Sequence, residues 1–323
     1  MAISIEESTQ ALDIFLNHYA KSTKNLASIG SSKGFPLKSD AARGDIGSGL
    51  EVVRDCFSSA RGATFRVLIN INPSHGAFYH TGPLSMLMTS HVVRNTIKLE
   101  RFLKSLRIQT AHLLERRNRA SEAILRVKTI FGLARTDDGH GLAHPPPVKK
   151  HGTGADDVEF WLDGEASSPV TPQAAVRADT RKSKGKEYNR VLQNTQLPVV
   201  NCGNRDNPMY LPAEVCAVLP GQPSKLKLDS AQARHTIRHA VRNPRENAVV
   251  IVGEGVQTGG LDEKINTLFR SFGLKSTPGV IKVPGRVLAD PKVIYMNNKA
   301  ANPRLGSWNM MDVRFIIAAS LPR

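Results

Sequence analysis

The segment between Leu197 and Pro223 constrains the fold of this chain more than any other. It opens with the apolar run 197–201, which predicts a short buried strand. A glycine and several Asx residues follow, and they favour a tight turn that uses positive φ angles and side-chain hydrogen bonds. These turn residues are Gly203, Asn204, Asp206 and Asn207. We therefore expect Tyr210 and Leu211 on an exposed Tyr-Leu-Pro-x-Glu element, although a lone tyrosine is more often a half-buried core residue.

The charge balance indicates a polyanionic partner. Of the 323 residues, 44 are Lys or Arg and 28 are Asp or Glu, which gives a net charge of +16. Such a balance favours nucleic acid or an acidic membrane surface. The sequence has no run of eighteen or more apolar residues and no signal-peptide pattern at its start, so we expect no membrane partner. We expect a cytoplasmic protein, with the nucleus as an alternative.

No pattern typical of catalysis or metal binding stands out in the sequence. Cys56, Cys202 and Cys216 are far apart and indicate reduced core thiols. His235 and His239 are spaced to share one helix face, but no Glu follows His235 as the zinc motif requires. Phosphate-binding loops, nucleophile elbows and dinucleotide fingerprints are also absent from the sequence. We therefore expect no enzyme activity, no cofactor, no metal and no small-molecule substrate.

Hydrophobic periodicity and breaker residues predict a mixture of helices and strands. Helices are expected over 9–19, 92–106 and 229–242, the last capped by Asp229 and ended by Asn243-Pro244. Strands are expected over 64–72, 107–112, 123–130, 158–162, 281–288, 291–295 and 313–321. A surface connection or an irregular strand pair is expected over 22–48, and a long loop over 132–154.

Several motifs, taken in order along the chain, resemble those of one protein family. Residues 49–61, 70–72 and 76–79 resemble the first Argonaute linker, and the segment from Gly82 resembles the start of a PAZ domain. Residues 283–288 and 306–310 resemble the second linker. The chain is thus similar to the N-terminal portion of a fungal-type Argonaute. We expect the end of the N domain and linker 1 over 1–81, PAZ over 82–222, linker 2 over 223–323, and no MID or PIWI region.

The resemblance implies an α+β fold. The PAZ domain would be an OB-like β-barrel with an αβ insertion, flanked by two mixed α/β linker regions. In this family the cleft between barrel and insertion clamps the 3′ end of a single-stranded guide RNA. A clamp of this kind needs cations for phosphates, hydroxyl donors and a stacking face.

The resemblance also assigns candidate residues for binding the RNA 3′ end. His112 falls on the family's phosphate-binding histidine; the alternative is a histidine satisfied at a strand end. Extra residues after it leave the family's basic position open among Arg116, Arg117 and Arg119. Tyr188 falls on a phosphate-binding tyrosine, and Tyr210 with Leu211 falls on the element that packs against the terminal nucleotide. The supporting cationic residues are Lys104, Lys182, Lys184 and Lys186.

Two departures from the family pattern weaken the expected clamp. The second tyrosine of the family is missing, and Thr180-Arg181 or Ser183 stands in its place. No phenylalanine stands in the 132–154 loop, where Leu142 or a rearrangement around 145–147 would have to replace the stacking face. Because aromatic stacking supplies roughly 1–3 kcal/mol per base, a leucine face predicts only modest affinity.

The sequence therefore predicts a non-catalytic RNA-binding module that anchors the 3′ end of a small guide RNA in RNA interference. The alternative is a truncated Argonaute fragment that acts as a structural or protein-interaction piece and binds RNA weakly, without end preference. A Dicer-type ribonuclease is disfavoured, because the linkers match Argonaute and no nuclease motif is present. Single-stranded small RNA is the expected partner, and Dicer and other silencing-complex proteins are further candidates.

Overall fold

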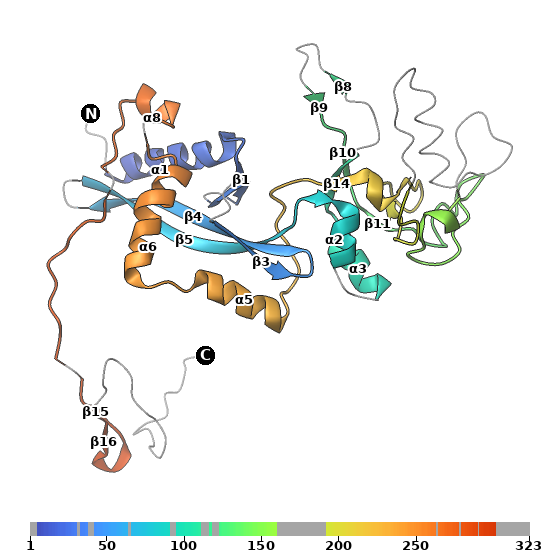
Figure 1. The fold of residues 1–323 in the computed structure, drawn as a ribbon. Coiled ribbons are helices and arrows are strands. Elements are labelled where there is room, and N and C mark those ends of the chain that lie inside the picture. Colours follow the sequence, from blue (N-terminus) through green and yellow to red (C-terminus); the bar gives the residue numbers. More distant parts are fainter. Residues whose placement is uncertain are drawn as a thin grey trace. The chain divides into compact units, whose positions relative to one another are not determined.

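A computed structural model gives the fold of this chain (Figure 1). The described residues are 5–30, 33–37, 42–63, 66–90, 95–110, 116–117, 123–159, 192–262, 264–277, 279–289 and 291–301, with 116–117, 123–124 and 301 described for the backbone only. The chain divides into two compact units, Met1–Pro278 and Gly279–Arg323. Each unit is described separately below.

A long antiparallel ribbon dominates the N-terminal part of the first unit. Strand β4 (Leu50–Ala63) pairs with β5 (Arg66–Tyr79) along their whole length, from Leu50 opposite Tyr79 to Ala63 opposite Arg66. Strands β2 (Lys33–Pro36) and β3 (Arg43–Gly47) pair with the other edge of β4, and β1 (Leu26–Ile29) pairs with β2. The segment expected to be a connection or an irregular strand pair therefore supplies three strands of this five-stranded sheet.

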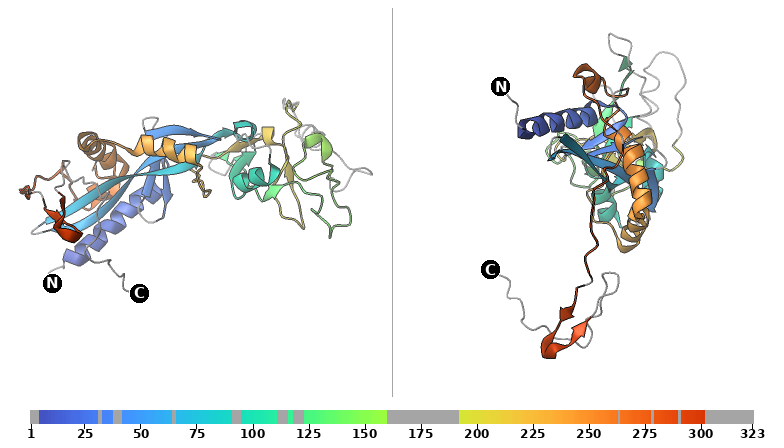
Figure 2. Two further views of the ribbon diagram at one scale, coloured as in Figure 1. Left: turned by 90° about the horizontal axis from the view of Figure 1, so that it is seen from below. Right: turned by 90° about the vertical axis from the view of Figure 1, so that its left-hand side faces the viewer.

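Helices cover both faces of this ribbon, as Figure 2 shows for α1 and α5. Helix α1 (Ile5–Ser22) packs on β4, where Asp13 Oδ1 accepts a hydrogen bond from the Ala60 amide at 2.7 Å. Its buried Leu16 forms a small core with Leu261 and Phe269, the latter on α8 (Thr267–Ser271). Helix α5 (Ser230–Ala240) contacts β3 and β5, and α6 (Pro244–Val250) leads into the π-helix η4 (Ile251–Gly255), which contacts β4 and β5. The short helix α7 (Val256–Thr258) lies beside α1, because a Cβ at Gly34 would contact both Ala20 and Thr258.

A second region holds the largest apolar core. Helices α2 (Leu84–Ser90) and α3 (Thr96–Leu103) pack with an open four-stranded sheet in the order β10-β7-β14-β6. These strands are Val127–Thr129, Arg107–Thr110, Cys216–Val218 and Gly82–Pro83. A three-stranded sheet joins β11 (Gly132–Leu133), β12 (Val200–Asn201) and β13 (Tyr210–Leu211). Short helical turns occur at η2 (Ala155–Asp157) and η3 (Ala213–Val215), and β8 (Arg116–Arg117) pairs with β9 (Ala123–Ile124).

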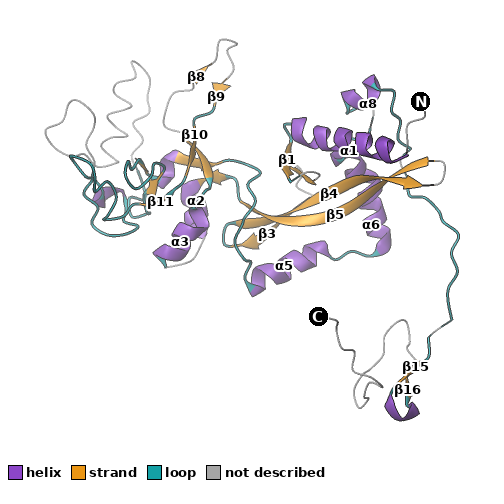
Figure 3. Ribbon diagram, turned by 180° about the vertical axis from the view of Figure 1, so that it is seen from behind, coloured by secondary structure: helices purple, strands orange, loops and turns teal. Residues whose placement is uncertain are grey.

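The second unit has little regular structure in its described part (Figure 3). Residues 279–289 form neither helix nor strand. Strand β15 (Val293–Ile294) pairs with β16 (Ala300–Ala301) around the turn η5 (Met296–Asn298). Across the described residues of the chain, no helix has the length and apolar character needed to span a membrane.

The helix predictions over 9–19 and 229–242 are confirmed, and α3 lies inside the predicted helix 92–106. The strand predicted over 64–72 belongs to the longer β5, and the strand predicted over 281–288 is wrong, since this segment lacks a pairing partner among the described residues. The strand predicted over 313–321 and most of the one over 158–162 lie outside the described residues.

The mixed α/β fold class is confirmed, while the barrel is not seen. The described strands between 82 and 222 form open antiparallel sheets, and no barrel closes among them. The loop prediction over 132–154 holds except at its start, where β11 forms, and at Val148, which makes an isolated bridge with Val158.

Candidate nucleic-acid interface

The β12–β13 hairpin carries Tyr210. Val200 pairs with Leu211, and Asn201 pairs with Tyr210. Val200 is fully buried, and β12 covers only Val200–Asn201, so the buried strand predicted over 197–201 is confirmed at its last two residues. Leu211 is half-buried and packs against the large core.

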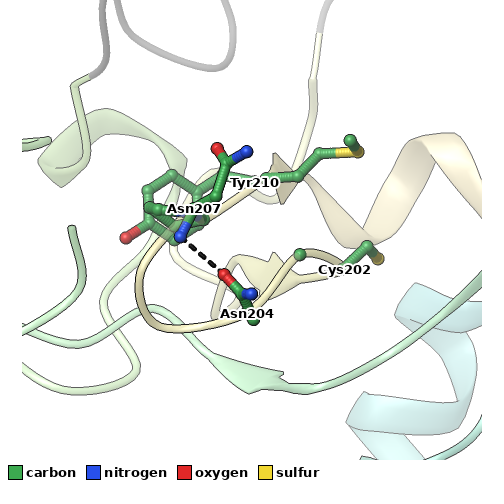
Figure 4. Close-up of a pocket in the computed structure, with 7 residues that line it drawn as sticks. Cys202, Asn204, Asn207 and Tyr210 are labelled. Carbon is green, nitrogen blue, oxygen red and sulfur yellow. Dashed lines mark hydrogen bonds between the residues drawn. The ribbon is translucent and has the colours of Figure 1, made fainter. Parts of the chain in front are cut away.

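Side-chain hydrogen bonds close the turn between these strands, as predicted. Asn201 Oδ1 accepts from the amides of Gly203 at 2.9 Å and Met209 at 3.0 Å. Asn204 Oδ1 accepts from the Asn207 amide at 2.5 Å (Figure 4). The prediction of positive φ angles is wrong, because none of the four turn residues adopts one. Gly203 is instead needed for close approach, since a Cβ there would lie 2.2 Å from the Asn207 carbonyl oxygen.

Tyr210 is buried, so the expectation of an exposed element is wrong. Its side chain is 7% exposed, and its hydroxyl donates to Asp138 Oδ2 at 2.9 Å. Burial, together with the nearby Asp138 and Asp137 carboxylates, raises the pKa of the Tyr210 phenol. The following segment is also held in place, because the Glu214 carboxylate accepts from the amides of Gln193 and Asn194 at 2.8 and 2.6 Å.

Asp138 is the centre of a buried polar network that the sequence does not reveal. The residue is 2% exposed. Besides the tyrosine hydroxyl, its Oδ2 accepts from the Arg135 amide at 3.1 Å and from Asn201 Nδ2 at 3.3 Å. These bonds connect the 132–154 loop to both strands of the hairpin.

Glu100 on α3 also holds the 132–154 loop in place, through contacts with Arg135 and Leu133. Its carboxylate accepts from Arg135 Nε at 3.2 Å and Nη2 at 2.5 Å, and from the Leu133 amide at 3.3 Å. Burial acts to raise the pKa of Glu100, but the hydrogen bonds from Arg135 and Leu133 outweigh it and lower this pKa overall. The Arg135 backbone, which donates to Asp138, is therefore fixed by a partly buried ion pair.

A hollow of about 470 Å³ opens beside the turn (Figure 4). It is lined by residues 202–204 and 207–210, none of which carries a charged side chain. Met209 is 42% exposed there, and the amides of Asn204 and Asn207 are exposed. The hollow therefore offers apolar surface and neutral hydrogen-bonding groups.

Lys104, Arg107 and the aromatic side chain of Phe131 form a cationic edge. This edge lies on the other side of Asn201 from Tyr210. Phe131, which follows β10, is 39% exposed, and Lys104 Nζ lies 5.8 Å from its ring centroid, within the range of a cation–π contact. Arg107 is exposed on β7 opposite Thr129. The Phe131 amide donates to the Asn201 carbonyl at 2.8 Å, which connects this edge to the hairpin.

Sequence reasoning missed Phe131 because it searched for a stacking aromatic only within 132–154. Leu142, the replacement considered there, is 40% exposed. An exposed aromatic one residue before a loop and next to basic strands is the signal that could have identified Phe131.

Most of the predicted site residues cannot be placed. His112, Arg119, Tyr188, Lys182, Lys184 and Lys186 lie outside the described residues. Arg116 and Arg117 form β8, for which the backbone alone is described. Lys104, Tyr210 and Leu211 are described, with Tyr210 and Leu211 adjacent on β13 and Lys104 beside Phe131. The convergence of the whole set stays a prediction.

Two protein-family models match this chain. The model of the Argonaute linker 1 domain matches residues 30–80, and that of the Argonaute linker 2 domain matches residues 246–295. The chain thus contains segments similar to both Argonaute linker domains. In the structure they contact each other, since Arg54 Nη1 on β4 lies 2.8 Å from Glu254 Oε2 on η4.

Relatives extend the similarity to nearly the whole chain. The chain is 26% identical to protein argonaute 12 and 24% identical to protein argonaute MEL1, both of Oryza sativa subsp. japonica, over 96% of this chain in each case. It spans 27% of the length of each of these relatives. Its fold is similar to that of Kluyveromyces polysporus Argonaute, solved with a guide RNA, with a TM-score of 0.59, 16% identity and coverage of 97% of this chain and 34% of that one.

Proposed function

We propose that this chain is the linker–PAZ–linker portion of a fungal-type Argonaute and anchors the 3′ end of a single-stranded small guide RNA in gene silencing. The observation that carries this proposal is the order of its parts. Linker 1 and linker 2 matches enclose residues 81–245, and argonaute similarity covers 96% of the chain. The net charge of +16 suits an RNA partner, and the similar K. polysporus protein was solved with a guide RNA.

The proposed domains are 1–81, 82–222 and 223–323. We expect the PAZ region to adopt an OB-like barrel with an αβ insertion. Cationic side chains would bind the backbone phosphates, with His112, one of Arg116, Arg117 and Arg119, and Tyr188 nearest the 3′ end. Lys104 and Lys182, Lys184 and Lys186 would add long-range attraction.

The remaining parts of the proposal concern the cellular setting. This chain would be non-catalytic and would act in the cytoplasm, with the nucleus as a second location. Dicer and other silencing-complex proteins would be its protein partners. These roles depend on binding of the RNA 3′ end.

Fluorescence anisotropy with a labelled short RNA tests the proposal. A single strand with a free 3′ end should bind more tightly than a blunt duplex or a circular form of the same sequence. If about four phosphates are engaged, log K should fall with log salt at a slope of roughly −3, because each contact on a single strand contributes about −0.7. A blunt duplex that binds as tightly as the free end would contradict the proposal.

Exposed apolar residues favour a second candidate function, that of a structural or protein-interaction fragment. In the 279–289 segment Val283, Val287 and Leu288 are all at least 70% exposed. Large apolar groups exposed together are typical of surfaces that pack on a partner. The paired substitution of Tyr188→Ala and Tyr210→Ala distinguishes the two functions, since only the RNA-end role predicts a selective loss of 3′-end binding.

A further inference from the structure

The four-stranded sheet β10-β7-β14-β6 buries only one of its two faces. Ile108 on β7 pairs with Val218 on β14, and both side chains are at most 4% exposed and belong to the large apolar core. Successive side chains of a strand point to opposite faces of a sheet. The residues next to Ile108 and Val218 therefore lie on the other face, which we call the outer face.

A row of uncharged residues crosses the outer face. Val127 on β10 lies opposite Gln109 on β7. Gln109 also lies opposite Ala217 on β14, which in turn lies opposite Pro83 on β6. Val127 is 42% exposed, Pro83 is exposed, and the two central residues are half-buried. Contiguous apolar surface that remains open to solvent is typical of an interaction site.

The cationic edge forms one border of this row. Arg107 is exposed and lies two residues before Gln109 on the same strand, so both side chains belong to the outer face. Lys104 Nζ lies 5.8 Å from the Phe131 ring centroid. The four strands contain two cations, Arg107 and Lys128, and no acidic residue.

Acidic side chains on the flanking elements α3 and η3 are engaged elsewhere. The Glu100 carboxylate accepts hydrogen bonds from the Arg135 guanidinium, and the Glu214 carboxylate accepts from the amides of Gln193 and Asn194. Neither carboxylate therefore offsets the cationic edge. Electrostatic complementarity favours a negatively charged partner for such a surface.

The side chains of the outer face favour a protein segment over single-stranded RNA. Unspecific binding of RNA bases relies on aromatic rings for stacking. Val127, Ala217 and Pro83 are aliphatic, and the Phe131 ring already has the Lys104 ammonium over it. Aliphatic surface packs well against apolar side chains of a peptide, and guanidinium and ammonium groups pair with its carboxylates.

We propose that the outer face of this sheet is a docking surface for an acidic protein segment that carries apolar anchor residues. The anchors pack on the row that runs from Val127 to Pro83, and the carboxylates pair with Arg107 and Lys104. This role concerns a protein partner and is independent of the proposed 3′-end function.

The test uses a fluorescent peptide, Glu-Asp-Leu-Asp-Trp-Glu, added to the full chain. Anisotropy measures its affinity, and the NMR signal of the Gln109 side-chain amide reports where it binds. A peptide with Gln and Asn in place of the acidic residues should bind about tenfold more weakly, the size expected for the loss of two surface ion pairs. A peptide with Ala in place of Leu and Trp should also bind about tenfold more weakly, because it buries less apolar surface.

A charge placed in the row locates the surface. Val127→Glu should weaken binding of the acidic peptide by about tenfold or more, since it removes apolar surface and repels the carboxylates. Val249→Glu is the matched control, because Val249 lies on α6 and is 67% exposed. It makes the same change of net charge and should alter the affinity by less than about twofold.

A second variant keeps the proposal testable if Val127→Glu fails to fold. Gln109→Glu adds the charge at the centre of the row with almost no change in side-chain size, and should weaken binding by about fivefold.

Three results with the peptides would overturn the proposal. They are an unchanged Gln109 signal at saturating peptide, equal affinities of the charged and neutral peptides, and equal affinities of Val127→Glu and Val249→Glu. Hexauridylate provides the RNA arm. If it displaced the peptide at a lower concentration than the peptide itself needs, and shifted the Gln109 signal, the face would be an RNA surface and the proposal would be wrong.

Discussion

Two buried tyrosines of this chain differ in the acceptor that their hydroxyls meet. The Tyr79 hydroxyl donates to the neutral Phe102 carbonyl at 2.8 Å, whereas the Tyr210 hydroxyl donates to the Asp138 carboxylate at 2.9 Å. Both side chains are almost fully buried. Because a hydrogen bond to a charged group contributes more than one between neutral groups, the two residues form a matched pair for testing the network.

Tyr210→Phe should therefore destabilise the protein more than Tyr79→Phe. We expect a loss of about 1–3 kcal/mol for Tyr210→Phe and about 1 kcal/mol for Tyr79→Phe in the free energy of unfolding. Urea unfolding followed by circular dichroism measures both values. Equal losses would show that Asp138 gains little from the tyrosine hydroxyl.

The contact between His75 and Arg242 predicts a pH dependence of stability. Its Nε2 accepts from Arg242 Nη2 at 2.8 Å, which requires an unprotonated nitrogen. Burial, with the charges of Arg242, Arg54 and His239, lowers the pKa of His75 from 6.5 to about 4. The unfolded state therefore binds more protons between these pH values, so stability is fully present above pH 6.5 and falls as the pH drops toward 4.

His75→Gln tests this origin of the pH dependence. Glutamine can accept from Arg242 and does not titrate, so the decline of unfolding free energy between pH 6.5 and 4 should become shallower. Urea unfolding at several pH values measures the slope. An identical slope in the variant would assign the dependence to other groups.

At the scale of elements, close backbone approach determines the Tyr210 hairpin. A Cβ at Gly203 would lie 2.2 Å from the Asn207 carbonyl oxygen and 2.8 Å from the Met209 nitrogen, and both of these are backbone atoms. Such atoms can move only if the turn moves. Gly141, in an open part of the 132–154 loop, meets nothing within 4 Å and provides a control.

Gly203→Ala should thus cost stability and alter the hollow, while Gly141→Ala should be nearly neutral. We expect a loss of about 1–3 kcal/mol for Gly203→Ala, the usual size for forced displacement of packed atoms. Thermal unfolding gives the stability, and the NMR signals of Asn204 and Asn207 report the turn geometry. An unperturbed Gly203→Ala spectrum would contradict the close-approach argument.

Local signals explain which elements the sequence could predict. Asp229 caps α5, accepting from the Gln232 amide at 2.8 Å, and the predicted helix was found. Asn243-Pro244 was interpreted only as the end of that helix, yet Asn243 also caps α6, and Pro244 occupies its first turn, where its missing N–H is no loss. The same dipeptide thus follows the end of α5 and begins α6.

The Asp138 network could not be predicted, because its members are distant in sequence. Asp138 is 72 residues from Tyr210 and 63 from Asn201, and an aspartate in a Gly-rich loop gives no sign of burial. The buried strand 197–201 and the Asx-closed turn were predictable, since both depend on neighbouring residues. Sequence patterns did not identify Asp138, the acceptor that binds the buried Tyr210 hydroxyl.

At the scale of the whole molecule, the cationic side chains and the side chains that line the hollow at Tyr210 are different groups. The net charge of +16 arises from 44 Lys and Arg against 28 Asp and Glu side chains, while the hollow at Tyr210 is lined by neutral ones. Attraction between cations and phosphates weakens with salt, whereas contacts of a neutral nucleoside do not depend on counterion release. The two contributions to RNA binding should therefore separate in a salt titration.

We expect the affinities for a free-end RNA and for a circular RNA of the same sequence to fall in parallel as salt rises, with their ratio constant. The phosphates are the same in both RNAs, so they share the roughly −0.7 slope per contact, and under the proposed 3′-end function only the free end would be recognised. Anisotropy titrations over a range of NaCl concentrations measure both slopes. A ratio that falls toward one at high salt would mean that ion pairs to the terminal phosphates, and not uncharged contacts, recognise the end.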